Sequence, residues 1–186
     1  MKYYVRPMRL EDVDQVTEID REAFPTMKPP TNFQRELSYP LAHYIVAVKQ
    51  EGMCEPVEAE ICIVGFAGIW LLADEAHIVN IAVRQACRRQ GIGELLLISL
   101  IELASGLEAS LVTLEVRASN SAARCLYGKY GFTVRGVRRG YYSDNREDAV
   151  IMTVDNINST LFRQYLGRLK KAHSERWGAP LYQIAY

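Results

Sequence analysis

The stretch that decides the fold spans residues 77–93 and reads HIVNIAVRQACRRQGIG. An apolar run rich in β-branched residues leads into a loop with two arginines and then into Gly91 and Gly93. The glycines allow a tight turn and the close approach of a ligand, because they carry no Cβ. Residues 94–106 are mostly apolar and predict a helix whose unpaired N–H groups and positive dipole end face this loop. A strand, a basic glycine loop and a helix N-terminus in this order predict a site for a diphosphate.

Two common diphosphate-binding motifs do not fit this loop. A dinucleotide fingerprint needs a third glycine three residues after Gly93, where this chain has Leu96. A Walker loop needs Gly-Lys followed by Ser or Thr, whereas Gly93 is followed by Glu94. An ordinary strand-to-helix turn, with glycines for geometry alone, stays open because short glycine motifs often match by chance.

The loop Arg88-Arg-Gln-Gly-Ile-Gly93 resembles the Arg/Gln-x-x-Gly-x-Gly/Ala loop of the GNAT acetyltransferases, whose ligand is the pyrophosphate of acetyl-CoA. Residues 114–132, LEVRASNSAARCLYGKYGF, are similar to the segment that follows this loop in the family. Residues 138–152, RRGYYSDNREDAVIM, and Glu22-Ala-Phe-Pro25 resemble one group within it. That is the RimI group, which acetylates the N-terminus of a ribosomal protein.

The resemblance implies that the chain binds acetyl-CoA as a cosubstrate and needs no metal. Backbone N–H groups of the loop would hold the pyrophosphate, and the edge of the preceding strand would pair with the pantetheine amides. Asn120 is also a good helix N-cap, and Arg88 and Arg89 could be plain solvated loop residues. The implied cofactor-binding residues are Ile81, Ala82, Val83, Arg88, Arg89, Gln90, Gly91, Ile92, Gly93, Glu94, Asn120 and Tyr127.

The resemblance also implies two catalytic residues, Glu115 and Tyr127. Acetyl transfer to an amine needs a neutral nucleophile, so a carboxylate acting directly or through water can serve as the base, and Glu115 is the candidate. Departing CoA leaves as a thiolate, which the phenol of Tyr127 could protonate. Glu115 could instead be a solvated strand residue, and Tyr127 could pack in the core with Ala123 and Tyr130 at helical spacing.

The acceptor implied by the resemblance is a protein N-terminal α-amine, with the N-terminal alanine of ribosomal protein S18 as the leading candidate and direct transfer as the mechanism. Phe24, Tyr141 and Tyr142 would bind it, although the two tyrosines could also be hairpin aromatics. A GNAT enzyme acting on a small amine or a lysine would keep the cofactor residues and differ at the loops 24–33 and 138–147. A non-catalytic acetyl-CoA-binding module would need neither proposed proton carrier.

Composition narrows the class of protein further. The chain of 186 residues has 22 basic and 22 acidic residues, so no global field favours nucleic acid or an anionic membrane. The four cysteines and three histidines show no zinc spacing, and Cys87 and Cys125 have no histidine placed to activate a thiol. Neither a signal peptide nor an apolar run of about 18 residues is seen, so we expect a cytoplasmic protein. His77 is expected to be structural.

The order of predicted elements indicates an α/β fold with a mixed sheet. By resemblance this is the GNAT fold, a mostly antiparallel sheet with a splayed parallel pair of strands, flanked by helices. The pair would be residues 75–83 and 111–116, with the glycine loop at the carboxyl end of the first. We expect a GNAT domain over 1–154 and a C-terminal helical extension over 155–186, with 50–60 as an exposed hairpin extension. The remaining predicted strands are 3–6, 43–49, 61–71, 133–138 and 149–154, and the helices are 10–23, 31–38, 94–106, 120–130 and one after 155.

Overall fold

The computed structural model describes residues 2–26, 29–50, 61–179 and 181–182. In chain order they form β1 (Lys2–Pro7), a 3-10 turn η1 (Leu10–Asp12), α1 (Val13–Ala23), α2 (Phe33–Glu36), β2 (Ala42–Gln50), β3 (Cys62–Leu72), β4 (Glu75–Val83), η2 (Gln85–Cys87), α3 (Ile92–Gly106), β5 (Leu111–Arg117), α4 (Ser121–Lys129), β6 (Thr133–Tyr142), β7 (Glu147–Asp155), α5 (Thr160–Trp177) and β8 (Leu181–Tyr182).

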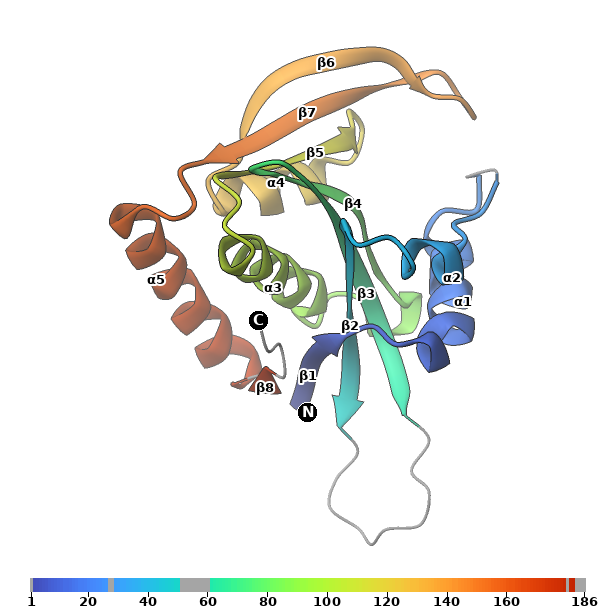
Figure 1. Cartoon of the computed structure of the whole chain (residues 1–186), viewed down its shortest axis with the longest axis horizontal. Coiled ribbons are helices and arrows are strands. Elements are labelled where there is room, and N and C mark those ends of the chain that lie inside the picture. The colour runs from blue at the N-terminus through green and yellow to red at the C-terminus, as the bar shows by residue number, and fades with distance from the viewer. Residues whose placement is uncertain (1, 27–28, 51–60, 180, 183–186) are drawn as a thin grey trace, which may run out of the picture.

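The described strands form one sheet in the order β6-β7-β5-β4-β3-β2-β1-β8. Neighbouring strands are antiparallel except for β4 with β5 and β1 with β8, which run parallel. Figure 1 shows α3 and α5 on one side of this sheet and α1 and α2 on the other. The predicted α/β fold, with its mostly antiparallel sheet and one central parallel pair, is confirmed.

Each face of the sheet has its own core. On the α3 side, Leu96, Leu97 and Ile98 are fully buried against the inward side chains of the strands. On the other side, Val16 and Ile19 of α1 pack with Phe33 of α2. Because the sheet is covered on both faces, β3 is buried along most of its length, and its sequence is a continuous apolar run rather than an alternation.

The parallel pair separates partway along, and this separation positions the functional site. β4 and β5 pair only from Glu75 opposite Leu111 to Ile78 opposite Leu114. Just beyond, the register of β3 against β4 shifts between Gly68 and Ile69, which leaves an additional residue of β4 bulged. The other edge of β4 stays paired with β3 as far as Val83. The second half of β4 therefore has its β5-side edge free of that strand.

The predicted elements differ from the structure mainly in one helix and two strands. The second helix is shorter than predicted, Phe33–Glu36. β6 continues through Tyr142, so the alternative that Tyr141 and Tyr142 are hairpin aromatics in the sheet is confirmed. β8, which no sequence pattern predicted, pairs with β1. The hairpin extension expected over 50–60 lies almost wholly outside the described residues. None of the helices in the described ranges is both long and apolar enough to cross a membrane.

Candidate active site

The glycine loop after β4 has a backbone shaped to present N–H groups. Arg89 has φ 63° and Gly91 has φ 78°, and a left-handed conformation at a residue other than glycine is typical of ligand clamps. Gly91 is the N-cap of α3 and has no side chain that could bond the first-turn N–H groups. By contrast, Asn32, Asn120 and Ser159 cap α2, α4 and α5 with side-chain oxygens. The N-terminus of α3 is thus left for an external acceptor.

Two features near this loop would suit a ligand: little hindrance at Gly93 and, among the described residues, an unpartnered acceptor at Asn80. A Cβ added to Gly93 would meet only Val83 Cγ2, at 3.8 Å, so the glycine leaves room in front of the helix. Arg88 Nε donates to the Val83 carbonyl at 3.2 Å, which ties the loop to the end of β4. Within the described part of the chain, Oδ1 of Asn80 is buried without a hydrogen-bond partner beside the free edge of β4. A buried amide oxygen of this kind is suited to a ligand N–H.

Glu115 lies where β4 and β5 separate. Leu114 and Val116 belong to the α3-side core, so alternation places Glu115 on the opposite face. Its side chain is only 7% exposed, and its two oxygens have different partners. Oε2 contacts His77 Nε2 at 2.6 Å, and Oε1 contacts Arg138 Nη2 at 3.0 Å. Since a carboxylate offers about four lone-pair positions, these two contacts within the described residues leave one on each oxygen for water or an amine.

Tyr127 comes from α4 and lies close to Tyr142 of β6. Its half-buried ring packs against Phe132, with ring centroids 5.8 Å apart. Burial, together with the charge of Tyr142, raises the pKa of Tyr127 to about 12. The pKa of Tyr142 also rises to about 12, first through burial; Arg117 opposes this rise, and Glu115 adds to it. Both phenols are therefore protonated at neutral pH, and Tyr142 links the surroundings of Tyr127 and Glu115.

Two segments far apart in the chain meet on this side of the molecule. Thr26, after α1, donates a hydrogen bond from Oγ1 to Asp144 Oδ2 at 2.6 Å, in the turn between β6 and β7. Arg117 at the end of β5 holds the same turn through Asp144, at 2.8 Å, and Glu147, at 3.2 Å. Its guanidinium also stacks over the Tyr142 ring at 4.0 Å. Hydrogen bonds from Ser119, aided by Arg117, lower the pKa of Glu147 to about 2.

A protein-family comparison decides the family. The model of the acetyltransferase (GNAT) family matches residues 13–132, more than half of the chain. The chain belongs to the GNAT family of acetyltransferases. It is accordingly an acyl-transferring enzyme.

Three comparisons place this GNAT enzyme among known proteins. A Bacillus subtilis protein provisionally named ribosomal protein bS18-alanine N-acetyltransferase is 42% identical over 154 residues, or 82% of this chain and 95% of that protein. The crystal structure of the Escherichia coli ribosomal-protein-S18-alanine N-acetyltransferase matches 83% of this chain and 94% of its own, with a TM-score of 0.68 and 30% identity. Arabidopsis thaliana NAA60 in complex with acetyl-CoA matches 85% of this chain and all of its own, with a TM-score of 0.71; at 20% identity it shows the fold alone.

Several predicted residues of the GNAT site prove to have structural partners. Asn120 Oδ1 accepts from Ala123 N at 3.1 Å, so the N-cap alternative for Asn120 is confirmed. Glu94 Oε1 accepts from Lys129 at 2.5 Å and Tyr130 at 2.6 Å, which joins α3 to α4. Burial alone would raise the pKa of Glu94, but these bonds outweigh it and lower the pKa. Phe24 is half-buried beside the α1–α2 core.

Sequence analysis missed the partners of Glu115. His77, expected to be structural and away from the loop, contacts the candidate base directly. The contact follows from the parallel register, in which His77 lies opposite Thr113, two residues before Glu115, so all three share one face. The contact with Arg138 likewise depends on the pairing of β6 with β7. Among the described residues no three His, Cys, Asp or Glu side chains gather in a group that could hold a metal ion.

Proposed function

We propose that this GNAT enzyme transfers the acetyl group of acetyl-CoA directly to the N-terminal α-amine of a protein, with the N-terminal alanine of ribosomal protein S18 as the leading acceptor. One observation carries the proposal: a carboxylate whose side chain is 7% exposed lies where β4 and β5 separate, and the free edge of β4 leads from there toward the loop before α3, whose N-cap has no side chain. The names of the Bacillus subtilis and Escherichia coli proteins support the acceptor. The cytoplasm, where ribosomal proteins are made, is the proposed compartment.

The cosubstrate would lie along the free edge of β4 and end at the glycine loop. Backbone groups of Ile81, Ala82 and Val83 would pair with its amides, and N–H groups over residues 89–94 would receive its pyrophosphate. When bound, acetyl-CoA supplies an acetyl thioester that an amine can attack. The positive charges of Arg88 and Arg89, both exposed beside the loop, favour the phosphates.

Glu115 would act as the general base. An α-amine has a pKa of about 7.7–8, so it must lose a proton before or during attack. The remaining lone pairs of Glu115 can accept that proton directly or through water. His77 is 26% exposed and its Nε2 lies 2.6 Å from Glu115, so in the tautomer with a bare Nε2 it could take the proton from Glu115 and release one to solvent from Nδ1. Arg138 keeps the carboxylate in place from the other side.

Tyr127 would serve the leaving group. Its phenol stays protonated at neutral pH, since burial raises its pKa to about 12. A protonated hydroxyl can donate a hydrogen bond to the sulfur as negative charge develops on it. Because its pKa lies above that of a thiol, about 8.5, the phenol stabilises the thiolate mainly as a hydrogen-bond donor. A proton that it gives up would be replaced from solvent.

The acceptor would enter where the segment after α1 meets the turn between β6 and β7, next to the hydrogen bond from Thr26 to Asp144. Phe24 lies in the first segment, and Tyr141 and Tyr142 come just before the second. Phenol hydroxyl groups can hydrogen-bond the backbone of an extended peptide, so these tyrosines fit a peptide N-terminus. We assign the catalytic domain to residues 1–154 and treat 155–186 as an extension of it.

The test is to incubate the purified protein with acetyl-CoA and a panel of N-terminal peptides, including one that begins Ala-Arg-Tyr, and to detect products by mass. Acetylation of the α-amine of that peptide is the expected result. Product only on lysine or on a small amine would reassign the acceptor while keeping the chemistry. Binding of acetyl-CoA without any product would indicate a non-catalytic module, and no binding would overturn the proposal.

A further inference from the structure

The C-terminal end of α5 contacts the glycine loop. His173 is 5% exposed, and its Nε2 lies 3.0 Å from the carbonyl oxygen of Gly91. Four residues later, the Trp177 ring covers the α-carbon of Gly91: a Cβ built there would lie 2.6 Å from Cδ1 and 2.7 Å from Nε1 of the ring. Gly91 is therefore required for two reasons, its φ of 78° and the close approach of an indole.

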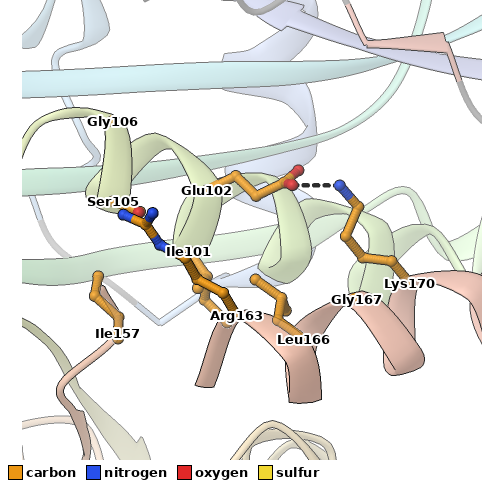
Figure 2. A pocket seen from close by; sticks show the side chains of 9 residues that line it. All are labelled: Ile101, Glu102, Ser105, Gly106, Ile157, Arg163, Leu166, Gly167 and Lys170. Atoms are coloured by element: carbon orange, nitrogen blue, oxygen red, sulfur yellow. Dashed lines mark hydrogen bonds and ion pairs between the residues drawn. The ribbon is translucent and has the colours of Figure 1, made fainter. Parts of the chain in front are cut away.

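This contact is local rather than part of a continuous helix interface. Between the first half of α5 and the second half of α3 lies a hollow of about 470 Å³, shown in Figure 2. The side chain of Lys170 closes one side of the hollow through its ion pair with Glu102, and Leu166 packs near its middle. His173 and Trp177 lie beyond it, against the loop.

The hydrogen bond from His173 has a defined direction. A carbonyl oxygen only accepts, so Nε2 of His173 must carry the hydrogen that it gives to Gly91. In the neutral imidazole Nδ1 is then the bare nitrogen, and within the described residues it is buried without a partner. The side chain thus uses one of its two polar atoms on the loop and leaves the other unsatisfied. Leu95 N donates to the same oxygen at 2.9 Å, so the Gly91 carbonyl accepts twice.

Fixing this carbonyl also fixes an N–H group. The carbonyl of Gly91 and the N–H of Ile92 belong to one planar, trans peptide unit, so they point in opposite directions. Ile92 is the first residue of α3, and its N–H has no acceptor within the helix. Because His173 binds the Gly91 carbonyl from the α5 side, the N–H of Ile92 points away from α5, beyond the N-terminus of α3. The loop is further tied to β1 by Tyr3, whose hydroxyl donates to Gln90 Oε1 at 2.7 Å.

We propose that His173 and Trp177 are positioning residues for acetyl-CoA, which hold the Gly91–Ile92 peptide in the orientation that receives the pyrophosphate. The inference rests on the proposed function, since it assumes that this loop binds the cosubstrate. His173 and Trp177 lie in α5, within the C-terminal extension proposed for residues 155–186. The C-terminal extension thereby becomes part of cosubstrate binding without touching the reacting atoms.

The experiment compares three variants of the full chain: His173→Leu, His173→Gln and Trp177→Leu. His173→Leu removes the donor, whereas the amide nitrogen of Gln can take the place of Nε2. We expect His173→Leu and Trp177→Leu to raise the KM for acetyl-CoA about 3- to 10-fold, the usual range for one lost hydrogen bond or apolar contact, and to leave kcat unchanged. His173→Gln should recover most of the loss. Lys171→Ala, an exposed change on the same helix, is the matched control.

A second measurement keeps the inference falsifiable if His173→Leu does not fold. Trp177 is one of two tryptophans, the other being Trp70, so binding of acetyl-CoA should change an emission signal that Trp177→Leu loses. Wild-type protein that binds no acetyl-CoA in calorimetry would end the proposed function itself. If the wild type binds acetyl-CoA normally and the variants keep the wild-type KM and emission change, His173 and Trp177 have no positioning role, and the proposed function is unaffected.

Discussion

The proposed cosubstrate side and the proposed acceptor side of the site are built in different ways. The cosubstrate side is one continuous stretch, in which β4, the loop and the first turn of α3 offer mainly backbone N–H groups. The acceptor side joins Thr26, Arg117 and Asp144, which come from three separate parts of the chain. A site made of local backbone can be recognised from its sequence. A site made of side chains from distant segments depends on the fold, so its specificity is much harder to predict.

Glu115→Gln is expected to have the largest effect, because Glu115 lies where the two sides meet. Removing the base should lower kcat by about 10²- to 10³-fold while acetyl-CoA binding is retained. Steady-state kinetics and calorimetry measure the two separately. Asp155→Asn is the control, because Asp155 is a carboxylate of β7 that lies opposite Leu111, at the start of β5. Normal turnover of Glu115→Gln across pH would remove Glu115 from the mechanism.

Tyr127→Phe should have the second-largest effect. We expect kcat to fall by about 10- to 100-fold with little change in either KM, since the hydroxyl acts on charge that develops only in the transition state. Tyr165→Phe, which removes a hydroxyl that donates to the Lys129 carbonyl, is the matched control. An unchanged rate in Tyr127→Phe would return this residue to a packing role beside Phe132.

The pH profile sharpens the same assignment. Burial raises the pKa of Tyr127 from 10 to about 12, so its protonated form persists to higher pH than usual. We expect kcat/KM for the peptide to rise as the α-amine loses its proton, near pH 7.7–8, and then to stay level to about pH 10. Initial rates corrected for uncatalysed acetylation would show this. A fall centred at pH 10 that Tyr127→Phe abolishes would contradict the raised pKa.

Gly91→Ala tests the cosubstrate side alone. A Cβ at φ 78° is strained and would meet the Trp177 ring at 2.6 Å, so the loop must shift. We expect the KM for acetyl-CoA to rise about 10-fold and the KM for the peptide to stay the same. Gly128→Ala is a matched control, because a Cβ there has nothing within 4 Å. Equal effects on both substrates would show that the two sides are not separable.

Thr26→Val tests the acceptor side and should have the smallest effect. Valine keeps the shape of threonine but cannot donate to Asp144, so the two acceptor segments lose one hydrogen bond. The KM for the peptide should rise about 3-fold, with the KM for acetyl-CoA unchanged. Thr133→Val, in β6, removes a hydroxyl outside these segments and serves as the control. A change confined to acetyl-CoA would place Thr26 on the wrong side of the site.

The accuracy of sequence analysis followed the same division. The glycine loop, β4, β5 and the ends of α3 were predicted closely, because apolar periodicity and Gly-x-Gly are local signals. Tyr141 and Tyr142 were expected near a loop, but β6 continues through them to Tyr142, which pairs with Glu147 across a short turn. The contact of His77 with Glu115 was missed because it depends on the parallel register of two strands joined by a long crossover. The roles of Glu115 and Tyr127 remain predictions.

The pairing of β8 with β1 places residues from distant parts of the chain side by side, with Tyr4 opposite Leu181. Contacts between such distant positions require the whole intervening chain to be present. During synthesis, β1 therefore lacks its β8 neighbour until residues 181–182 have left the ribosome.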